Sequence, residues 1–285
     1  MAFPERPRAL ITGAGSGLGR ALAVALAERR ARLFLTDIDP EGLSRTAEAA
    51  AAAGAEVMTA PHDVGDAEAW AGLPERLEPW GGLDILVNNA GVAVSGPMGA
   101  VSLDNWKWQL DVNLWSVVYG CHTFVPMFRS QGSGWILNVA STAGLVSLPE
   151  LGPYNVTKSA VVALSRTLRA ELAGTGVKVS ALCPTFFQSR IHERARTAES
   201  QVELTRVLIE GARWTADDVA QVALRNLERG KLHILPQLDA KLAWLLQRLW
   251  PSGFQWVLTQ LHGSALLEDW AKRRSKALPA PGETT

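Results

Sequence analysis

Residues 12–19 read Thr12-Gly13-Ala14-Gly15-Ser16-Gly17-Leu18-Gly19, between an apolar run at residues 8–12 and an alanine- and leucine-rich segment at residues 18–30. Glycines let the backbone turn tightly and approach a phosphate closely, and the start of a helix offers unpaired N–H groups. Glycine-rich runs also serve plain turns and helix packing. The position between a strand-like and a helix-like segment favours dinucleotide binding, through Gly13, Gly15, Ser16, Gly17, Leu18 and Gly19.

Short apolar runs alternate with segments of helical periodicity, a pattern typical of a parallel sheet covered by helices on both faces. We expect strands at residues 8–12, 32–36, 56–60, 85–88, 134–139 and 178–182, and the first two helices at residues 18–30 and 41–53. The pattern predicts an α/β fold with a doubly wound, Rossmann-type parallel sheet in three layers, as a single domain with a helical C-terminal extension. We place the Rossmann-type domain at residues 1–231 and the extension, rich in tryptophan and leucine and ending in a flexible polar tail, at residues 232–285.

The composition argues against several classes of protein. The 285 residues are 47% hydrophobic, which suffices for one large core. Their formal net charge is zero, so no overall field would attract nucleic acid. The two cysteines, Cys121 and Cys183, lack the spacing of a metal site and fit a reducing compartment. This spacing also means that we expect no metal. Residues 1–8 leave no room for the apolar part of a signal peptide, so we expect a cytoplasmic protein.

An acidic residue, Asp37, follows the second expected strand, where a carboxylate can accept hydrogen bonds from the adenosine ribose. It favours NAD, because the 2′-phosphate of NADP would face a carboxylate and the position before Gly17 is Ser16 rather than a basic residue. A different interpretation is that Asp37 or Asp39 only caps the next helix. The nearby basic residues, which leave room for NADP, are Arg20 and Arg45.

A catalytic pattern follows in the second half of the chain: Ser141, then Tyr154, then Lys158 at the i+4 position. One helical turn separates the last two, so the phenol and the ammonium project from one face. A free tyrosine has a pKa of about 10, and a nearby positive charge stabilises the phenolate. Each residue alone has an ordinary explanation, as a solvated serine, a core tyrosine or a surface lysine. Together, after a nucleotide-binding loop, they predict acid–base catalysis.

At these residues the chain resembles the short-chain dehydrogenase/reductase family, in order from residue 8 to about residue 231. Asp63 and Val64 are similar to its adenine-contacting pair, and Asn88-Asn89-Ala90-Gly91 is similar to its motif after the fourth strand. Asn113 matches the asparagine that the family uses to hold a water in its proton relay. The resemblance implies cofactor contacts from Asp63, Val64, Asn89, Ala90 and Gly91.

The same resemblance implies the catalytic roles. Tyr154 would be the acid or base, Ser141 would orient and polarise the substrate oxygen, and Asn113 would link the relay to solvent. Lys158 would lower the pKa of Tyr154 and bind the nicotinamide ribose, so Tyr154 and Lys158 both contact the cofactor. Further cofactor contacts are expected at Pro184, Phe187 and Ser189. The family commonly has glycine after this proline; here Thr185 could crowd or hydrogen-bond the nicotinamide carboxamide.

The loops expected to select the substrate are apolar, which predicts a small hydrophobic alcohol or ketone; their residues are Val92, Val94, Leu145, Val146, Leu148, Leu151, Phe186 and Phe187. Ordinary core packing is the other interpretation for each of them. In the extension, leucines recur at helical spacing beside Lys241 and Arg248, so it could lie on a membrane surface. The interpretation that we favour from the sequence is a helix pair packed on the protein's own core, as a lid or at a subunit interface.

Three functional hypotheses follow. The leading one is an NAD-dependent dehydrogenase/reductase that interconverts a hydrophobic secondary alcohol and its ketone. The second is an NADPH-dependent carbonyl or 3-oxoacyl reductase. The third is a non-enzymatic nucleotide-sensing protein on the same scaffold, which predicts a degraded catalytic set. Family habit implies a homodimer or homotetramer.

Overall fold

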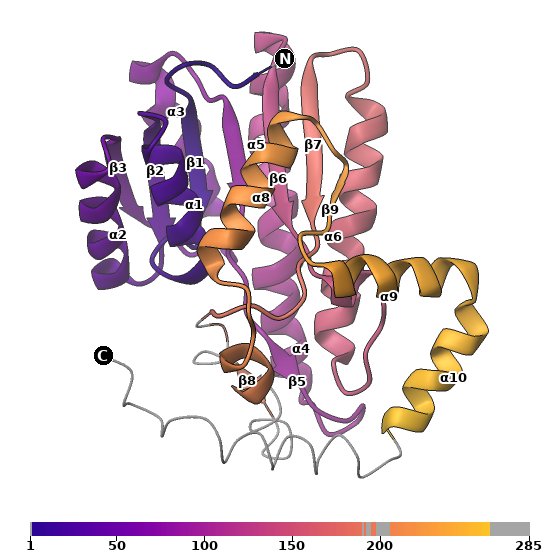
Figure 1. The fold of residues 1–285 in the computed structure, drawn as a ribbon. Helices are drawn as coiled ribbons and strands as arrows, with labels where there is room; N and C mark the ends of the chain where they lie inside the picture. Colours follow the sequence, from indigo (N-terminus) through magenta and orange to yellow (C-terminus); the bar gives the residue numbers. More distant parts are fainter. Residues whose placement is uncertain (1, 190, 192–194, 198–205, 263–285) are drawn as a thin grey trace.

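The computed structural model describes residues 2–189, 191, 195–197 and 206–262. Its centre is a seven-stranded parallel sheet in the order β3-β2-β1-β4-β6-β7-β9 (Figure 1). The strands are β1 (Arg8–Thr12), β2 (Arg32–Asp37), β3 (Glu56–Pro61), β4 (Ile85–Asn88), β6 (Gly134–Val139), β7 (Val177–Leu182) and β9 (His233–Ile234). The strand order reverses between β1 and β4, and in such sheets ligands bind beside the reversal, at the carboxyl ends of the strands.

Helices cover both faces of this sheet. The first face carries α1 (Gly17–Ala27), α2 (Pro40–Ala52) and α8 (Ala216–Glu228), and the second carries α3 (Leu73–Leu77), α5 (Ser116–Gln131) and α6 (Gly152–Glu171). Successive residues of β1 alternate between two cores, with Ala9 and Ile11 in the first and Leu10 in the second. The fold is therefore three-layered and Rossmann-type, as the sequence predicted.

Shorter elements complete the described part. A two-stranded parallel pair, β5 (Val94–Ser95) with β8 (Arg196–Thr197), lies near α4 (Leu103–Leu110) below the sheet (Figure 1). Single turns are η1 (Glu68–Trp70), η2 (Glu78–Trp80), η4 (Thr142–Gly144) and a π-helical turn, η3 (Asp111–Trp115), between α4 and α5.

The expected strands lie where the sequence placed them, to within one residue at each end. The first expected helix is too long at its end: α1 stops at Ala27, and Arg30 has a left-handed φ of 55°. The last strand, β9, was not expected, because two residues carry no readable periodicity. It joins the sheet beside β7 although it lies beyond the boundary placed after residue 231.

The helical extension is confirmed over the part of it that the structure describes. It consists of α9 (Leu238–Leu249) and α10 (Pro251–His262), which together we call the arm. In Figure 1, α9 leaves the body beside β9, and α10 turns sharply downward from its far end. Trp250 separates the two helices, and Pro251 occupies the first position of α10, where its missing N–H costs no helical hydrogen bond. The expected polar tail falls on residues 263–285, outside the described residues.

Candidate active site

The glycine loop is built from backbone geometry that other residues would strain. Gly13 and Gly17 have positive φ values of 63° and 52°, and a Cβ at Gly19 would collide with the carbonyl oxygen of Gly13. The side-chain amide of Asn89 donates to the carbonyl oxygens of Thr12 and Gly13, at 2.9 and 3.0 Å. These bonds hold the loop against the end of β4.

The start of α1 fits the pyrophosphate of a dinucleotide. Among the described residues, no side chain caps its first turn: Ser16, at the N-cap, makes no capping bond, and the turn carries no acidic residue. Leu18 and Gly19, which belong to this turn, are buried. Uncapped N–H groups and the positive end of the helix dipole suit an anion here.

Asp37 ends β2 and is held at the glycine loop. One carboxylate oxygen accepts from the Gly15 N–H at 2.8 Å and the other from the Asp39 N–H at 2.9 Å. The capping interpretation applies to Asp39, which accepts from the Gly42 N–H at the start of α2. Asp37 therefore lies beside the loop in the place where a ribose-binding carboxylate is expected.

The remaining adenine-side residues follow β3. Asp63 is exposed, and its carboxylate accepts from the Gly65 N–H at 2.9 Å. Val64 is buried, and its carbonyl oxygen accepts from the Trp70 indole at 3.1 Å. Both stand at the carboxyl edge of the sheet, where the resemblance places them.

The segment after β4 connects the glycine loop to the catalytic residues. The Ala90 N–H donates to the Thr12 hydroxyl at 3.1 Å. A Cβ at Gly91 would lie 3.4 Å from the Asn113 side-chain oxygen and 3.5 Å from the Lys158 ammonium nitrogen. Gly91 therefore lies between Asn113 and Lys158, where the two halves of the site meet.

Ser141, Tyr154 and Lys158 come together at the carboxyl end of β6. Tyr154 and Lys158 lie on α6, with the lysine Nζ 5.7 Å from the centre of the tyrosine ring. Ser141 precedes η4, where its hydroxyl accepts from the Ala143 N–H at 3.1 Å, and its side chain lies close enough to Tyr154 to act on the pKa of the phenol. The Lys158 ammonium is buried and donates to the Val139 carbonyl oxygen at 2.8 Å.

Burial decides the proton affinities of this group. Desolvation raises the pKa of Tyr154, and the hydrogen bond from Ser141 offsets only part of the rise. Burial also lowers the pKa of Lys158 to about 8. We expected the lysine to lower the pKa of Tyr154, but the net shift in this geometry is upward, because the ammonium is directed to Val139 and the phenol is desolvated.

Asn113 lies in the π-helical turn η3 and is fully buried. Its side-chain oxygen accepts from the Val92 N–H at 2.8 Å, and its side-chain nitrogen donates to the Val92 carbonyl at 2.9 Å. Gln109 donates to the same carbonyl at 3.1 Å. The amide of Asn113 therefore fixes the chain just after Gly91. Sequence reasoning gave no sign of its pairing with Val92.

The loop after β7 is tied to the start of the arm. The Thr185 N–H donates to the Gln237 side chain at 3.2 Å, and the Thr185 hydroxyl donates to the two Asp239 carboxylate oxygens at 3.1 and 3.2 Å. Sequence reasoning had directed this hydroxyl towards the nicotinamide and had missed both partners. In the same loop, the Pro184 carbonyl accepts from the Thr142 N–H at 2.9 Å.

The remaining predicted residues of these loops divide between packing and exposure. Phe187 packs partly against the first core, and Ser189 is half-buried. Three of the expected substrate-pocket residues are buried, as the packing interpretation holds: Val92, Val94 and Val146. Leu145 packs partly against the second core. Leu148, Leu151 and Phe186 are more open, with Phe186 40% exposed.

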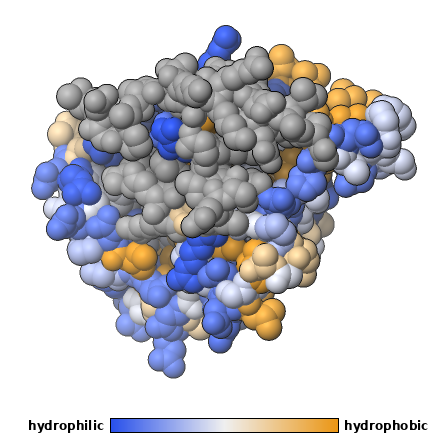
Figure 2. All heavy atoms as spheres, turned by 90° about the horizontal axis from the view of Figure 1, so that it is seen from below, coloured by the Kyte–Doolittle hydropathy of each residue, from blue (hydrophilic) through white to orange (hydrophobic). Residues whose placement is uncertain are grey.

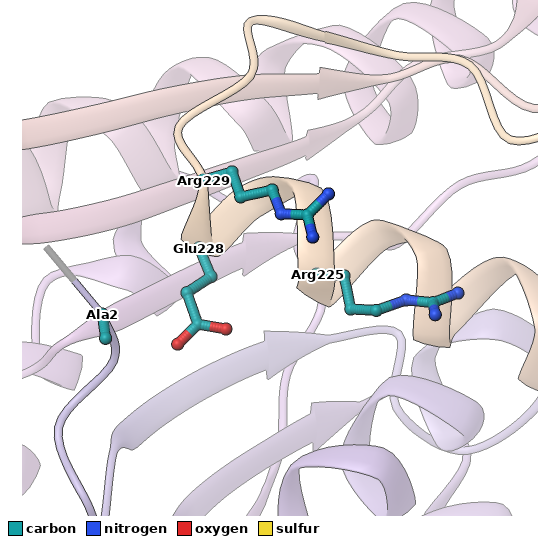
Figure 3. Close-up of a pocket in the computed structure, with 4 residues that line it drawn as sticks. All are labelled: Ala2, Arg225, Glu228 and Arg229. Carbon is teal, nitrogen blue, oxygen red and sulfur yellow. The ribbon is translucent and has the colours of Figure 1, made fainter.

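A hollow of about 370 Å³ lies far from these residues (Figure 3). It is lined by Ala2, Arg225, Glu228 and Arg229. Glu228 in it accepts from the Phe3 N–H at 3.1 Å and pairs with Arg29 at 3.2 Å. It adjoins the segment that leads into β1, at the amino edge of the sheet, whereas ligands of this fold bind at the carboxyl edge. It is therefore not the active site.

Comparison with known proteins identifies the family. A family model described as short chain dehydrogenase matches residues 7–200. The oxidoreductase SadH of Mycobacterium tuberculosis is 33% identical over 270 residues, which cover 93% of this chain and 97% of that protein. The chain belongs to the short-chain dehydrogenase family and is an oxidoreductase of that type, as its motifs predicted.

Two solved structures extend the likeness to the fold. A short-chain dehydrogenase/reductase from Burkholderia phymatum in complex with NAD has a TM-score of 0.81 and 34% identity, covering 85% of this chain and 93% of its own. A short-chain dehydrogenase from Sphingobium yanoikuyae in complex with NADPH has a TM-score of 0.74 and 26% identity, covering 87% and 95%. These neighbours support a nicotinamide dinucleotide as the cofactor without distinguishing NAD from NADP.

Proposed function

We propose that the protein is an NAD-dependent dehydrogenase/reductase that interconverts a hydrophobic secondary alcohol and its ketone. The observation that carries the proposal is that two separate features lie at the same carboxyl edge of the sheet. Asp37 accepts a hydrogen bond from the Gly15 N–H of the glycine loop, and Ser141 lies beside Tyr154 at the carboxyl end of β6, where it offsets part of the rise in the pKa of the phenol. The first suits a ribose with free hydroxyls, and the second suits proton transfer to or from a substrate oxygen.

In the proposed chemistry Tyr154 carries the proton. Its raised pKa keeps the phenol protonated at neutral pH, so it can donate to the oxygen of a ketone as the carbonyl carbon is reduced. When bound, the nicotinamide supplies or accepts the hydride. In the oxidative direction the phenolate form of Tyr154, stabilised by the Lys158 ammonium, takes the hydroxyl proton, and Ser141 holds the reacting oxygen in line.

Lys158 and Asn113 have supporting roles in this proton transfer. With a pKa of about 8, Lys158 is mostly charged at neutral pH and can hold a ribose hydroxyl while stabilising a developing phenolate. Asn113 fixes the backbone at Val92, on the substrate side of Gly91.

The preference for NAD rests on charge. A carboxylate at Asp37 repels the 2′-phosphate of NADP, and Arg45, one of the basic residues nearby, lies 3.8 Å from Glu41 in an exposed ion pair. The preference for an apolar substrate rests on Leu148, Leu151 and Phe186 in the loops after β6 and β7.

The second candidate is an NADPH-dependent carbonyl or 3-oxoacyl reductase. Its cofactor is supported by the NADPH complex of the Sphingobium yanoikuyae relative. Its oxoacyl substrate is supported by a similar 3-ketoacyl-(acyl-carrier-protein) reductase from Brucella melitensis, with a TM-score of 0.69 and 28% identity, although that structure is complexed with NADH. We also propose a homodimer or homotetramer formed through α4 and α5. Between these helices Trp115, in η3, is 46% exposed and stacks on Tyr119 of α5.

A binding titration tests the cofactor assignment without a known substrate. Energy transfer from the eleven tryptophans to reduced nicotinamide would be followed with NADH and with NADPH. We expect NADH to bind at least about tenfold more tightly, with much of the difference lost in Asp37→Ser. Tighter NADPH binding would favour the second candidate. Binding of neither would revive the hypothesis of a non-enzymatic protein on this scaffold.

A further inference from the structure

The arm begins with a helix whose leucines face outward. On α9, Ala240 is fully buried and Trp244 packs against the second core. Five leucines on the opposite side are between 49% and 75% exposed: Leu238, Leu242, Leu245, Leu246 and Leu249. At about 100° per residue they fall within an arc of about 100°, centred opposite Ala240. The leucines thus form one continuous outer stripe.

The apolar surface continues beyond this helix. Trp250, Trp256, Val257 and Leu261 are 59%, 61%, 38% and 41% exposed. Figure 2, seen from below, shows hydrophobic surface towards the right, the side on which Figure 1 places the arm. Soluble monomers rarely expose a contiguous apolar patch of this extent, and such patches mark binding surfaces.

Positive charge borders the stripe on one side. Lys241 and Arg248 lie on one flank of α9 and, with Lys231, line a hollow of about 360 Å³ beside β9. The ten lining residues, all within the described part of the chain, include no aspartate or glutamate. His233 also lines this hollow. Burial lowers its pKa, and the charges of Arg166 and Arg248 lower it further. The border of the stripe therefore suits an anion.

The arm is held to the body at several points, so the stripe is presented on a fixed support. Its first turn is bonded to Thr185 through Asp239, the ring of Trp244 lies 5.1 Å from that of His233, and His262 lies 3.8 Å from Glu150. No described helix is long and apolar enough to cross a membrane. An outward leucine stripe with cations on its flank and exposed tryptophans instead matches a helix that lies in the membrane interface.

We propose that the arm docks the protein on an anionic membrane surface. The leucine stripe enters the outer part of the acyl region, Trp250 and Trp256 lie at headgroup level, and the Lys241–Arg248 flank binds lipid phosphates. This proposal concerns binding alone and stands whether or not the proposed reaction is correct.

Co-sedimentation of the full-length protein with vesicles tests it. We expect binding to phosphatidylcholine vesicles that contain phosphatidylglycerol, and binding at least about tenfold weaker to phosphatidylcholine alone. Leu242→Glu/Leu249→Glu should abolish binding to both, while Lys241→Glu/Arg248→Glu should remove the preference for anionic vesicles. Met98→Glu changes an apolar side chain that is 82% exposed elsewhere and should bind as the parent does.

Other occupants of the stripe give distinct results, each of which overturns the proposal. Failure of the parent protein to bind either vesicle, with a dimer that Leu242→Glu/Leu249→Glu converts to monomer, assigns the stripe to a second copy. Vesicle binding that appears only after removal of residues 263–285 assigns it to the end of this chain. Unchanged binding of Leu242→Glu/Leu249→Glu, with its circular dichroism preserved, places any membrane contact elsewhere.

Discussion

Two leucine-rich helices of this molecule use the same side chain in opposite ways. On α1, Leu18, Leu22 and Leu26 are at most 7% exposed and fill the core beneath the glycine loop. On α9, Leu242 and Leu249 are 52% and 75% exposed. Both helices have clear periodicity, so periodicity identifies the residues that share a face but not what that face contacts. The glycine loop before α1 indicates that this helix packs on the sheet beside a nucleotide site. No motif next to α9 in the sequence indicates what its leucines contact.

The largest effect is expected in the candidate active site, whose chemistry the sequence reveals. Tyr154→Phe removes the hydroxyl that transfers the proton and should lower kcat by about a thousandfold. Cofactor affinity should stay within a few fold, because the ring and Lys158 remain. Steady-state rates beside a cofactor titration measure both quantities, and full turnover in this variant would contradict the proposed mechanism.

Paired truncations test the contrast between the helices directly. Leu22→Ala empties a fully buried position on α1 and should cost about 3 kcal/mol of unfolding free energy. Leu242→Ala removes the same atoms from an exposed position and should change the unfolding free energy by less than about 0.5 kcal/mol. Urea denaturation of both variants gives the difference. Equal losses would show that the outer stripe is covered in solution.

A third prediction concerns the charge of Lys158. Its pKa of about 8 means that the ammonium is largely present at pH 7 and largely lost at pH 9. If the charged form holds the nicotinamide ribose, affinity for NADH falls as the pH rises, by about tenfold between those values. Lys158→Met should bind weakly and show no such slope. A parent affinity that is flat across this range would remove Lys158 from the ribose contact.

A small effect is expected where the two regions meet. Asp239→Ala removes the acceptor for the Thr185 hydroxyl in an exposed hydrogen bond, so the unfolding free energy should fall by about 0.5–1.5 kcal/mol. Asp239→Asn keeps an acceptor in place and serves as the control. The urea denaturation midpoint and kcat/KM of both variants would be measured. A large fall in kcat/KM at unchanged stability would mean that this bond positions the active-site loop.

The sequence predicted the features that local chemistry determines. Strands β1, β4 and β6 have the expected bounds, because each is an apolar run bounded by turn residues. Tyr154 and Lys158 share a helix face because one turn separates them. Long-range partners could not be predicted in this way. The bonds from Thr185 to Gln237 and Asp239, and from Asn113 to Val92, join segments whose closeness only the folded chain creates.

Two further features depend on burial, which the sequence does not reveal. The sign of the pKa shift at Tyr154 depends on burial, which the spacing of Tyr154 and Lys158 does not reveal. The apolar residues of the substrate loops could not be divided into lining and packing, and Val94 and Val146 proved to be buried. Residue type indicated the chemistry in each case, while solvent access required the three-dimensional structure.

The most direct test of the central claim is turnover with the two oxidised cofactors in parallel. Initial rates of nicotinamide reduction would be measured with NAD and with NADP against a series of secondary alcohols of increasing apolar size. The account predicts kcat/KM at least about tenfold higher with NAD, rising along the series and lost in Tyr154→Phe. Faster turnover with NADP, or turnover that survives in Tyr154→Phe, would contradict it.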